Sequence, residues 1–358
     1  MDHSEYLSPH VRCGWAYNRA MRKAIIALTA TLLGLLALIY GALQIRSAPP
    51  VDDAWLLKGR ESVPVGAFTV RFTGTTTLLF SDGVTSWMVD GWFSRPSLFE
   101  VLRGKIAPDL EAIEFGLAQN QVESLAAVIP VHSHYDHAMD APEVARRTGA
   151  VLMGSESTAN IGRGWQLPAE QIAVLEDRKP VQLGDFTITP IESRHFEFAD
   201  AELRAELIEG DQRIAEPLVP PVRLQDYRLG KAYVLHIDHP KGSVAVVGSA
   251  GFVPDGLAGF NADVVFLGVG GLASQSEAYR ESYWRETVDL LQPSLVVPVH
   301  YDSLTAPIEG DIPGTDWLLS IVSGERAETT LEFLRAKGRA NPDVSFGVMP
   351  RYEQVILF

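Results

Sequence analysis

The residues that most directly indicate chemistry in this 358-residue chain lie in the segment Pro130–His137, which reads PVHSHYDH. Three imidazoles and one carboxylate fall within six residues there: His132, His134, Asp136 and His137. Imidazole nitrogen and carboxylate oxygen are the usual ligands of catalytic zinc, which takes three protein ligands and keeps one position open. His132 and His134 can face one ion in an extended turn, and Asp136 and His137 fall on the other side of this turn. The segment therefore indicates a metal site, and it suits two metals better than one.

Two later histidines also follow predicted strands. The segment Leu125–Ile129, just before the first cluster, is apolar and predicts a buried strand. His195 follows the predicted strand Phe186–Ile191, and His300 follows the predicted strand Leu295–Val299. Either histidine alone is more often an ordinary surface or core residue. Together with the first cluster they complete two three-ligand sites at strand ends.

The remaining pattern predicts the elements that must hold these ligands. Short apolar runs predict strands at 68–72, 75–80, 86–89, 151–153, 232–237, 243–247 and 263–267, and helical patterns occur at 97–103, 141–147 and 277–291. Two mixed halves of hairpins and strand–helix units predict two packed sheets covered by helices. The acidic, proline-containing stretch at about 197–230 interrupts this pattern. It is either an inserted lid or binding loop, or a mobile surface excursion.

The N-terminus predicts a membrane anchor. Residues 24–43 carry no charge, and twenty residues at about 1.5 Å each span the roughly 30 Å hydrocarbon core. The leader, residues 1–23, is basic before this segment, so we expect it in the cytoplasm and the rest of the chain on the periplasmic or extracellular side. A cleaved signal peptide is the alternative, but the leader is long and no small-residue cleavage site follows. Residues 44–64 are then a linker, and residues 65–358 a single domain.

Composition excludes some partners. The formal net charge of -15 argues against nucleic acid, because phosphate binding needs a basic surface. The only cysteine, Cys13, lies in the leader, so the domain has neither a disulfide nor a thiolate ligand.

The HxHxDH motif with separate downstream histidines resembles the metallo-β-lactamase fold superfamily over about residues 66–305. The resemblance implies an α/β fold, a four-layer αβ/βα sandwich, here preceded by one transmembrane helix. It also implies that His132, His134 and His195 hold a first zinc, and that Asp136, His137 and His300 hold a second. Asp90 is similar to an early aspartate of the superfamily that supports the metal loop. Its alternative role is that of a plain turn residue before Gly91.

The segment HYDHAMD with Gly248–Phe252 looks most like the branch that contains N-acylphosphatidylethanolamine phospholipase D and ascorbate-6-phosphate lactonase. This likeness implies that Asp140 supports the metal site from behind the ligands; the alternative is a cap for the helix that follows. One departure concerns Ser249, which stands where most relatives carry an aspartate that bridges two metals. A neutral hydroxyl cannot tie two cations together, so the alternatives are two zinc ions without that bridge or a single ion.

These observations predict a membrane-anchored zinc hydrolase. Zinc lowers the pKa of a bound water to about 7 and so supplies hydroxide at neutral pH. Asp136 is expected to orient this hydroxide for attack on an ester, lactone, amide or phosphodiester of a small-molecule or lipid-like substrate. Two other classes remain open, an iron-binding redox protein of the same fold and a non-catalytic, membrane-tethered binding protein with a degenerate metal site.

Overall fold

The structure is a computed structural model that describes residues 9–43, 45–97, 100, 104–198, 201–316, 320 and 326–358. The chain divides into an N-terminal unit that ends at Ile45 and a body that runs from Arg46 to Phe358. Residues 1–8 of the expected leader, and most of the helix expected at 97–103, lie outside the described residues.

The N-terminal unit is one long helix, α1 (Pro9–Leu43). Its segment Met21–Ala42, 22 residues long, contains an 18-residue window with a mean hydropathy of 2.2, and none of that window is buried. At about 1.5 Å per residue this segment is long enough to cross a bilayer. A signal sequence near an N-terminus has the same properties.

The body contains two seven-stranded sheets within its described residues. The first has the order β14 (Val355–Ile356), β1 (Thr69–Gly74), β2 (Thr77–Ser81), β3 (Ser86–Val89), β4 (Ala127–Ile129), β5 (Val151–Gly154) and β6 (Ile172–Val174). The second has the order β13 (Ser345–Phe346), β12 (Leu295–Val299), β11 (Val264–Gly268), β10 (Gly242–Val247), β9 (Ala232–His239), β8 (Phe186–Ser193) and β7 (Val181–Leu183).

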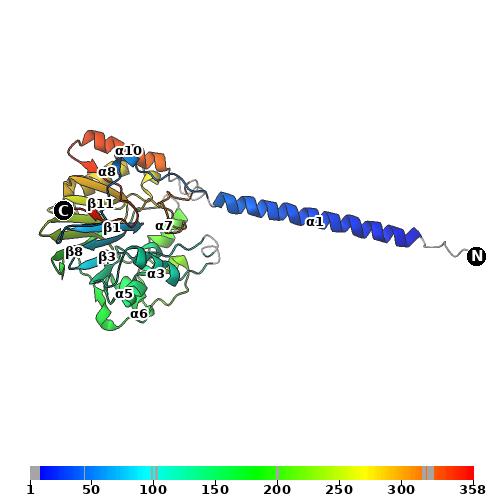
Figure 1. Ribbon diagram of the computed structural model, residues 1–358, viewed down its shortest axis with the longest axis horizontal. Coiled ribbons are helices and arrows are strands. Elements are labelled where there is room, and N and C mark those ends of the chain that lie inside the picture. The colour runs from blue at the N-terminus through cyan, green and yellow to red at the C-terminus, as the bar shows by residue number, and fades with distance from the viewer. Residues whose placement is uncertain are drawn as a thin grey trace, which may run out of the picture. The chain divides into compact units, whose positions relative to one another are not determined.

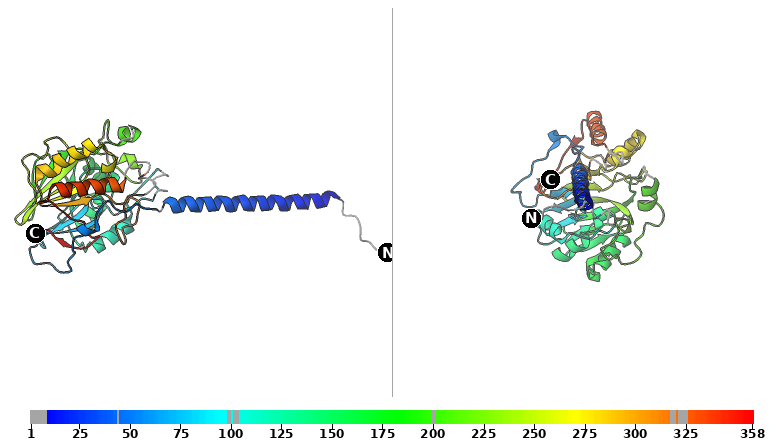
Figure 2. Two further views of the ribbon diagram at one scale, coloured as in Figure 1. Left: turned by 90° about the horizontal axis from the view of Figure 1, so that it is seen from above. Right: turned by 90° about the vertical axis from the view of Figure 1, so that its right-hand side faces the viewer.

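Helices cover the outer face of each sheet. On the first sheet these are α3 (Leu110–Gln119), α5 (Ala141–Thr148) and α6 (Glu156–Gly164), and on the second α8 (Glu277–Trp284) and α10 (Ala327–Ala340). Figures 1 and 2 show the two groups on opposite sides of the body. Val144 of α5 packs in one buried cluster with Leu152 of β5, and Trp284 and Leu334 pack in the cluster that contains Phe266 of β11. This is the four-layer αβ/βα sandwich that the sequence predicts.

The core between the two sheets is aromatic and aliphatic. Phe68 contacts Phe80 and Phe186 edge-on, with ring centroids 5.8 and 5.1 Å apart. All five residues of β11 are buried, because this strand is covered by a sheet on one side and by helices on the other. The uninterrupted apolar run that predicts the strand at 263–267 follows from this double burial.

The direction of the strands brings the candidate ligands to one edge. Strands β3 and β4 are parallel, as are β10, β11 and β12. Strand β8 is antiparallel to β9, which is antiparallel to β10, so β8 also points the same way as β10. The residues that follow β3, β4, β8 and β12 therefore converge, and they include Asp90, His132, His195 and His300.

Three segments differ from the sequence-based expectation. The helix expected at 277–291 is α-helical only to Trp284 and continues as a π-helix, η5 (Arg285–Asp289). The strand expected from Leu125 begins at Ala127. Residues expected as a linker pack on the body: Arg46 forms an ion pair of 2.8 Å with Asp316, and a short turn, η1 (Asp53–Trp55), places the Trp55 ring 4.7 Å from Phe346.

The stretch expected as an insertion contains two short helical elements, α7 (Ala201–Leu207) and η3 (Leu224–Asp226). Its second half is fixed to α6, where Asn160 Nδ2 donates to the Ile214 carbonyl at 2.7 Å and Ser157 Oγ accepts from the Ile214 amide. Helix α7, in contrast, lies beside the histidine cluster described below.

Candidate metal centre

Two groups of three side chains at this edge present ligand atoms within 4.8 Å of one another. One group is His132, His134 and His195, and the other is Asp136, His137 and His300. Four of these residues come from the short segment that contains α4 (Tyr135–Ala138), and the other two come from the loops after β8 and β12. The structure therefore brings together all six ligand-type residues that the sequence singles out.

Hydrogen bonds fix which nitrogen carries the lone pair in two of the three histidines of the first group, His195 and His134. His195 Nδ1 donates to the Phe196 carbonyl at 2.8 Å, so its Nε2 carries a lone pair. His134 Nε2 donates to the carbonyl of Leu207 in α7 at 3.2 Å, which leaves its Nδ1 as the lone-pair nitrogen. That Nδ1 lies 3.2 Å from His132 Nε2.

The second group has the same arrangement. His137 Nδ1 is 2.7 Å from Asp90 Oδ2 and donates to it, so His137 Nε2 carries a lone pair. This nitrogen is 3.1 Å from His300 Nε2 and 3.5 Å from Asp136 Oδ2. The third distance within this group, from His300 Nε2 to Asp136 Oδ2, is 3.3 Å.

These distances fit a metal ion. Ligand atoms about 2.0–2.1 Å from one tetrahedral zinc lie about 3.3–3.4 Å apart, and the four distances above range from 3.1 to 3.5 Å. Buried lone pairs that face one another at this distance repel unless a proton or a cation lies between them. The proton of His137 is committed to Asp90, so the second group is satisfied by a cation or by a proton on His300 Nε2 that Asp136 accepts.

The protonation states of the first group and of Asp136 also suit metal binding, whereas the burial of His300 is outweighed by its hydrogen bond to Asp136, which raises the pKa of His300. Burial, followed by the neighbouring histidines, lowers the pKa of His132 well below its usual value. Burial lowers the pKa of His134 to about 4 and lowers that of His195 as well, so the three imidazoles are neutral at pH 7. Burial opposes the ionisation of Asp136, but His137 and His300 outweigh it and lower the pKa of this carboxyl. Neutral imidazole and ionised carboxylate are the forms that bind a metal.

Asp90 orients the second group rather than acting as a plain turn residue. It lies at φ 58° and is fully buried. Besides its bond to His137, its Oδ1 accepts from the Val131 amide at 2.9 Å, and its Oδ2 accepts from the Thr76 hydroxyl. A carboxylate behind a metal-binding histidine fixes the tautomer and the ring orientation.

Asp140 does not cap the helix that follows it, although it occupies the N-cap position of α5. Its carboxylate accepts from the amides of Phe93 and Ser94 at 2.8 and 2.6 Å, and from the Ser94 hydroxyl at 2.8 Å. The capping alternative is therefore wrong, because the side chain holds the loop after Asp90 instead. Burial raises the pKa of Asp140 to about 6 despite these hydrogen bonds.

Ser249 is not among the converging ligand atoms. Its Oγ accepts from the Phe196 amide at 3.4 Å, and its carbonyl accepts from the Tyr283 hydroxyl at 3.3 Å. These contacts hold the loop that carries His195. Ser249 therefore supports the loop of one ligand, His195.

A cleft of about 390 Å³ lies beside His195, between the end of β8 and α7. Its lining combines the apolar side chains Ile208 and Leu229 with charged groups of both signs. The charged residues are Glu192, Arg194, Glu197 and Lys231. This volume is typical of sites for small molecules.

A third group, formed by Asp82, Asp185 and His239, has metal-like spacing, but its hydrogen bonds do not suit a metal. The Lys241 amide donates to His239 Nδ1 at 3.2 Å, which leaves the imidazole proton on Nε2. This nitrogen is 3.6 Å from Asp82 Oδ2 and faces it as a donor. The group is therefore a polar contact where strands β2, β7 and β9 end. His236 and Asp238 belong to neither of the two ligand groups at the metal edge, and His236 Nε2 donates to the Asn261 carbonyl at 2.7 Å.

The strand order and the two ligand sets at one edge of an αβ/βα sandwich are those of the metallo-β-lactamase fold that the sequence resembles. No protein-family model and no curated protein sequence matches the chain. Among solved structures it is similar to a metallo hydrolase from the archaeon Ignicoccus hospitalis, at 16% identity over 82% of this chain and 99% of that one, with a TM-score of 0.46.

Two further structures are similar to the chain. An isothiocyanate hydrolase from Delia radicum gut bacteria is 17% identical over 81% of this chain and 98% of that one, with a TM-score of 0.46. The diiron β-hydroxylase CmlA from Streptomyces venezuelae is 12% identical over 83% of this chain and 55% of that one, with a TM-score of 0.48. Because these sequence identities and TM-scores are low, the fold assignment rests on the strand order and the positions of the ligand residues. The narrower likeness to the phospholipase D and lactonase branch stays a prediction.

The sequence did not point to several residues that complete the centre. Thr76 bonds Asp90, and the Leu207 carbonyl fixes His134, yet neither belongs to a recognisable motif. Asp302 follows His300 by two positions and belongs to no recognisable motif of its own. The repeat of His-Tyr-Asp at 134–136 and 300–302 is a signal that marks it.

Proposed function

We propose that the protein is a membrane-anchored, zinc-dependent hydrolase that cleaves an ester, lactone, amide or phosphodiester. The observation that carries the proposal is the pair of buried or partly buried three-ligand groups whose ligand atoms lie within 4.8 Å of one another. The three distances within the second group are 3.1 to 3.5 Å, and His134 Nδ1 lies 3.2 Å from His132 Nε2. A donor set of imidazole and carboxylate without thiolate suits catalytic zinc. Two ions match the two groups, one for each.

The chain's own residues would divide the work between them. When bound, zinc supplies a water of lowered pKa and polarises an oxygen of the substrate. His132, His134 and His195 would hold one ion, and Asp136, His137 and His300 the other. Asp136 is ionised and faces both histidines of its group, so its second oxygen would orient the attacking water by accepting a hydrogen bond. Burial of the ligands excludes bulk water from this step.

The cleft beside His195 is the proposed place for the substrate. Its volume of about 390 Å³ fits a small molecule or one polar end of a lipid, and its mixed lining offers apolar contact as well as both signs of charge. Segment 21–42 of α1 is proposed as the anchor, with the body on the non-cytoplasmic side, as the basic leader indicates. An anchored enzyme meets lipid-like and envelope-derived substrates at high local concentration.

Elemental analysis of the full chain, purified in detergent without added metal, tests the proposal first. The expected result is zinc at close to two equivalents, and less than about half an equivalent would contradict a catalytic zinc site. Bound iron in place of zinc would favour the redox alternative, because imidazole and carboxylate ligands serve both metals.

A substrate screen follows, with phosphodiester, lactone, ester and β-lactam compounds and with His134→Ala as the matched control. The wild-type chain should hydrolyse at least one class, and the variant should lose that activity. Equal activity of the two chains would reject this site. Full occupancy by zinc without any hydrolysis would favour the non-catalytic binding protein.

A further inference from the structure

The ligand His300 lies in a strained turn that a second strained residue supports. His300 is at φ 58° and Thr75, between β1 and β2, is at φ 51°. Such values are uncommon for residues other than glycine, and for a β-branched threonine they are outliers. The two turns are joined directly, because the His300 amide donates to the Thr75 carbonyl at 2.7 Å. Strained backbone persists only where surrounding contacts hold it.

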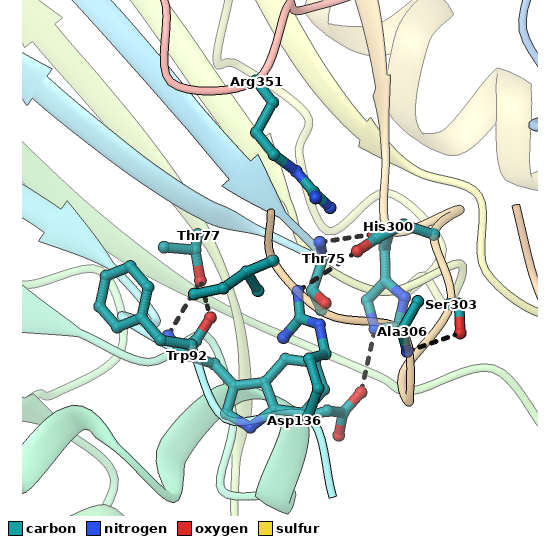
Figure 3. A network of polar contacts seen from close by, with 12 residues as sticks. Thr75, Thr77, Trp92, Asp136, His300, Ser303, Ala306 and Arg351 are labelled. Atoms are coloured by element: carbon teal, nitrogen blue, oxygen red, sulfur yellow. Dashed lines mark hydrogen bonds and ion pairs between the residues drawn. The ribbon is translucent and has the colours of Figure 1, made fainter. Parts of the chain in front are cut away.

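The contact that holds this pair comes from Asp302. Its Oδ1 accepts from the Thr75 amide at 2.6 Å, and its Oδ2 lies 3.3 Å from Arg95 Nη2. Thr75 is therefore bound on both sides, by Asp302 at its amide and by His300 at its carbonyl. Figure 3 shows Thr75 and His300 next to each other, with Asp136 joined to the imidazole of His300 on the other side.

The carboxylate of Asp302 also forms an ion pair with Arg95. Its side chain is 1% exposed and that of Arg95 is 4% exposed, so the ion pair is buried. The guanidinium lies 3.8 Å from the centroid of the Trp92 ring, and its Nε has no hydrogen-bond partner among the residues that the structure describes. Asp302 is the one carboxylate within ion-pair distance of Arg95 in that part of the chain. A buried cation needs such a partner.

Gly74 provides the space for this pair. A Cβ added there would lie 2.5 Å from Asp302 Oδ2 and 2.8 Å from Arg95 Nη2, and Gly74 has a φ of 142°. The backbone before Thr75 therefore approaches the carboxylate as closely as only glycine allows.

We propose that Asp302 is a positioning residue that, held by Arg95, fixes His300 in the geometry needed to bind the second metal. This inference rests on the proposed metal centre. Asp302 belongs to neither ligand group and binds the Thr75 amide, so it acts on His300 through the backbone of Thr75. Residues behind a metal ligand typically change metal affinity by about 10–100-fold when they are removed.

The test is a competition titration of the full chain with zinc and a chromophoric chelator, for wild type and Asp302→Asn. Asparagine keeps the shape, but one of its two polar positions becomes a donor that faces either Arg95 or the Thr75 amide. The second equivalent should bind at least about tenfold more weakly, while the first equivalent, on His132, His134 and His195, should keep its affinity. With cobalt, the visible spectrum of the second equivalent alone should change.

Asp316→Asn is the matched control. Asp316 is also a buried carboxylate that is paired with an arginine, Arg46, and accepts from Ser303, but it bonds neither Thr75 nor His300. Asp316→Asn should bind the first and the second equivalent of zinc with the affinities of wild type. An equal loss in the two variants would mean general destabilisation and would overturn the positioning role.

Two further outcomes are decisive. If wild type binds two equivalents and Asp302→Asn binds both within about threefold of wild type, the positioning role is refuted and the metal centre stands. If wild type itself binds fewer than two, the two-metal centre fails and this inference fails with it. Should Asp302→Asn not fold, Arg95→Lys must show the same selective loss, because lysine keeps the charge but cannot stack and pair in the same way. Unchanged binding in that variant would overturn the proposal.

Discussion

Replacing Asp90 by asparagine should weaken the second metal site selectively. Both oxygens of Asp90 act as acceptors, Oδ1 for the Val131 amide and Oδ2 for His137 and Thr76. In Asp90→Asn one of these positions becomes an NH₂ group. If it faces His137, the imidazole proton must move to Nε2, and the nitrogen that faces His300 loses its lone pair.

The size of the effect follows from the burial of the contact. Asp90 and His137 are both fully buried, so no water replaces the lost acceptor. A hydrogen bond to a charged group contributes about 1.5–3 kcal/mol. At about 1.4 kcal/mol for each factor of ten, this is a loss of roughly 10- to 100-fold in affinity, which agrees with the usual effect of changes behind metal ligands.

Isothermal titration of the metal-free full chain with zinc measures both affinities. The matched control is Asp316→Asn, since Asp316 is a buried carboxylate that pairs with Arg46 and accepts from Ser303 but bonds no histidine. We expect two binding steps in the control and a weakened second step in Asp90→Asn. Two unchanged steps in Asp90→Asn would refute the reasoning that the carboxylate fixes the tautomer of His137.

Three other changes have expected outcomes. Gly251→Ala should weaken zinc binding at the first site and lower the free energy of unfolding in urea by about 1–3 kcal/mol, because the added Cβ would lie 2.0 Å from the Arg194 carbonyl beside His195. An unchanged zinc affinity and an unchanged free energy of unfolding would contradict this close packing. The pKa of Asp140 is raised to about 6, so the stability that its protonated carboxyl contributes is full at low pH and is lost as pH rises through 6. Between about pH 5 and 7, the free energy of unfolding of metal-free wild type should fall by about 1 kcal/mol more than that of Asp140→Asn. Parallel plots of unfolding free energy against pH for the two chains would contradict this. The double variant Leu32→Arg, Leu36→Arg should release the chain from the membrane fraction, since each arginine at the centre of a transmembrane helix costs about 2.5–3.5 kcal/mol of insertion free energy. Retention of this variant in the membrane after carbonate extraction would argue against the anchor.

The ligand residues could be predicted from the sequence because their signal is local. Four of them lie within six residues, and the other two follow strands that apolar runs mark clearly. The strand Leu295–Val299 has the predicted bounds because its burial on both faces leaves no polar residue in the run. Edge strands β13 and β14 have only two residues each, and no pattern of that length predicts a strand.

The supporting contacts could not be predicted, because they join residues that are far apart in the chain. Asp302 meets Thr75 across 227 positions, and Leu207 meets His134 across 73. No periodicity records such pairs. The role of Asp140 was open between two alternatives for the same reason, since only the fold shows that Phe93 and Ser94, and not the helix amides, lie within reach of its carboxylate.

X-ray absorption at the zinc edge of the full chain, loaded with two equivalents, tests the central claim most directly. Five histidines and one carboxylate shared by two ions predict a shell of nitrogen and oxygen at about 2.0–2.1 Å, without sulfur and with scattering from two to three imidazoles per zinc. His300→Ala should lower the imidazole number and leave one tightly bound ion. A sulfur shell, or fewer than about one imidazole per zinc, would contradict the two three-ligand groups as the metal centre.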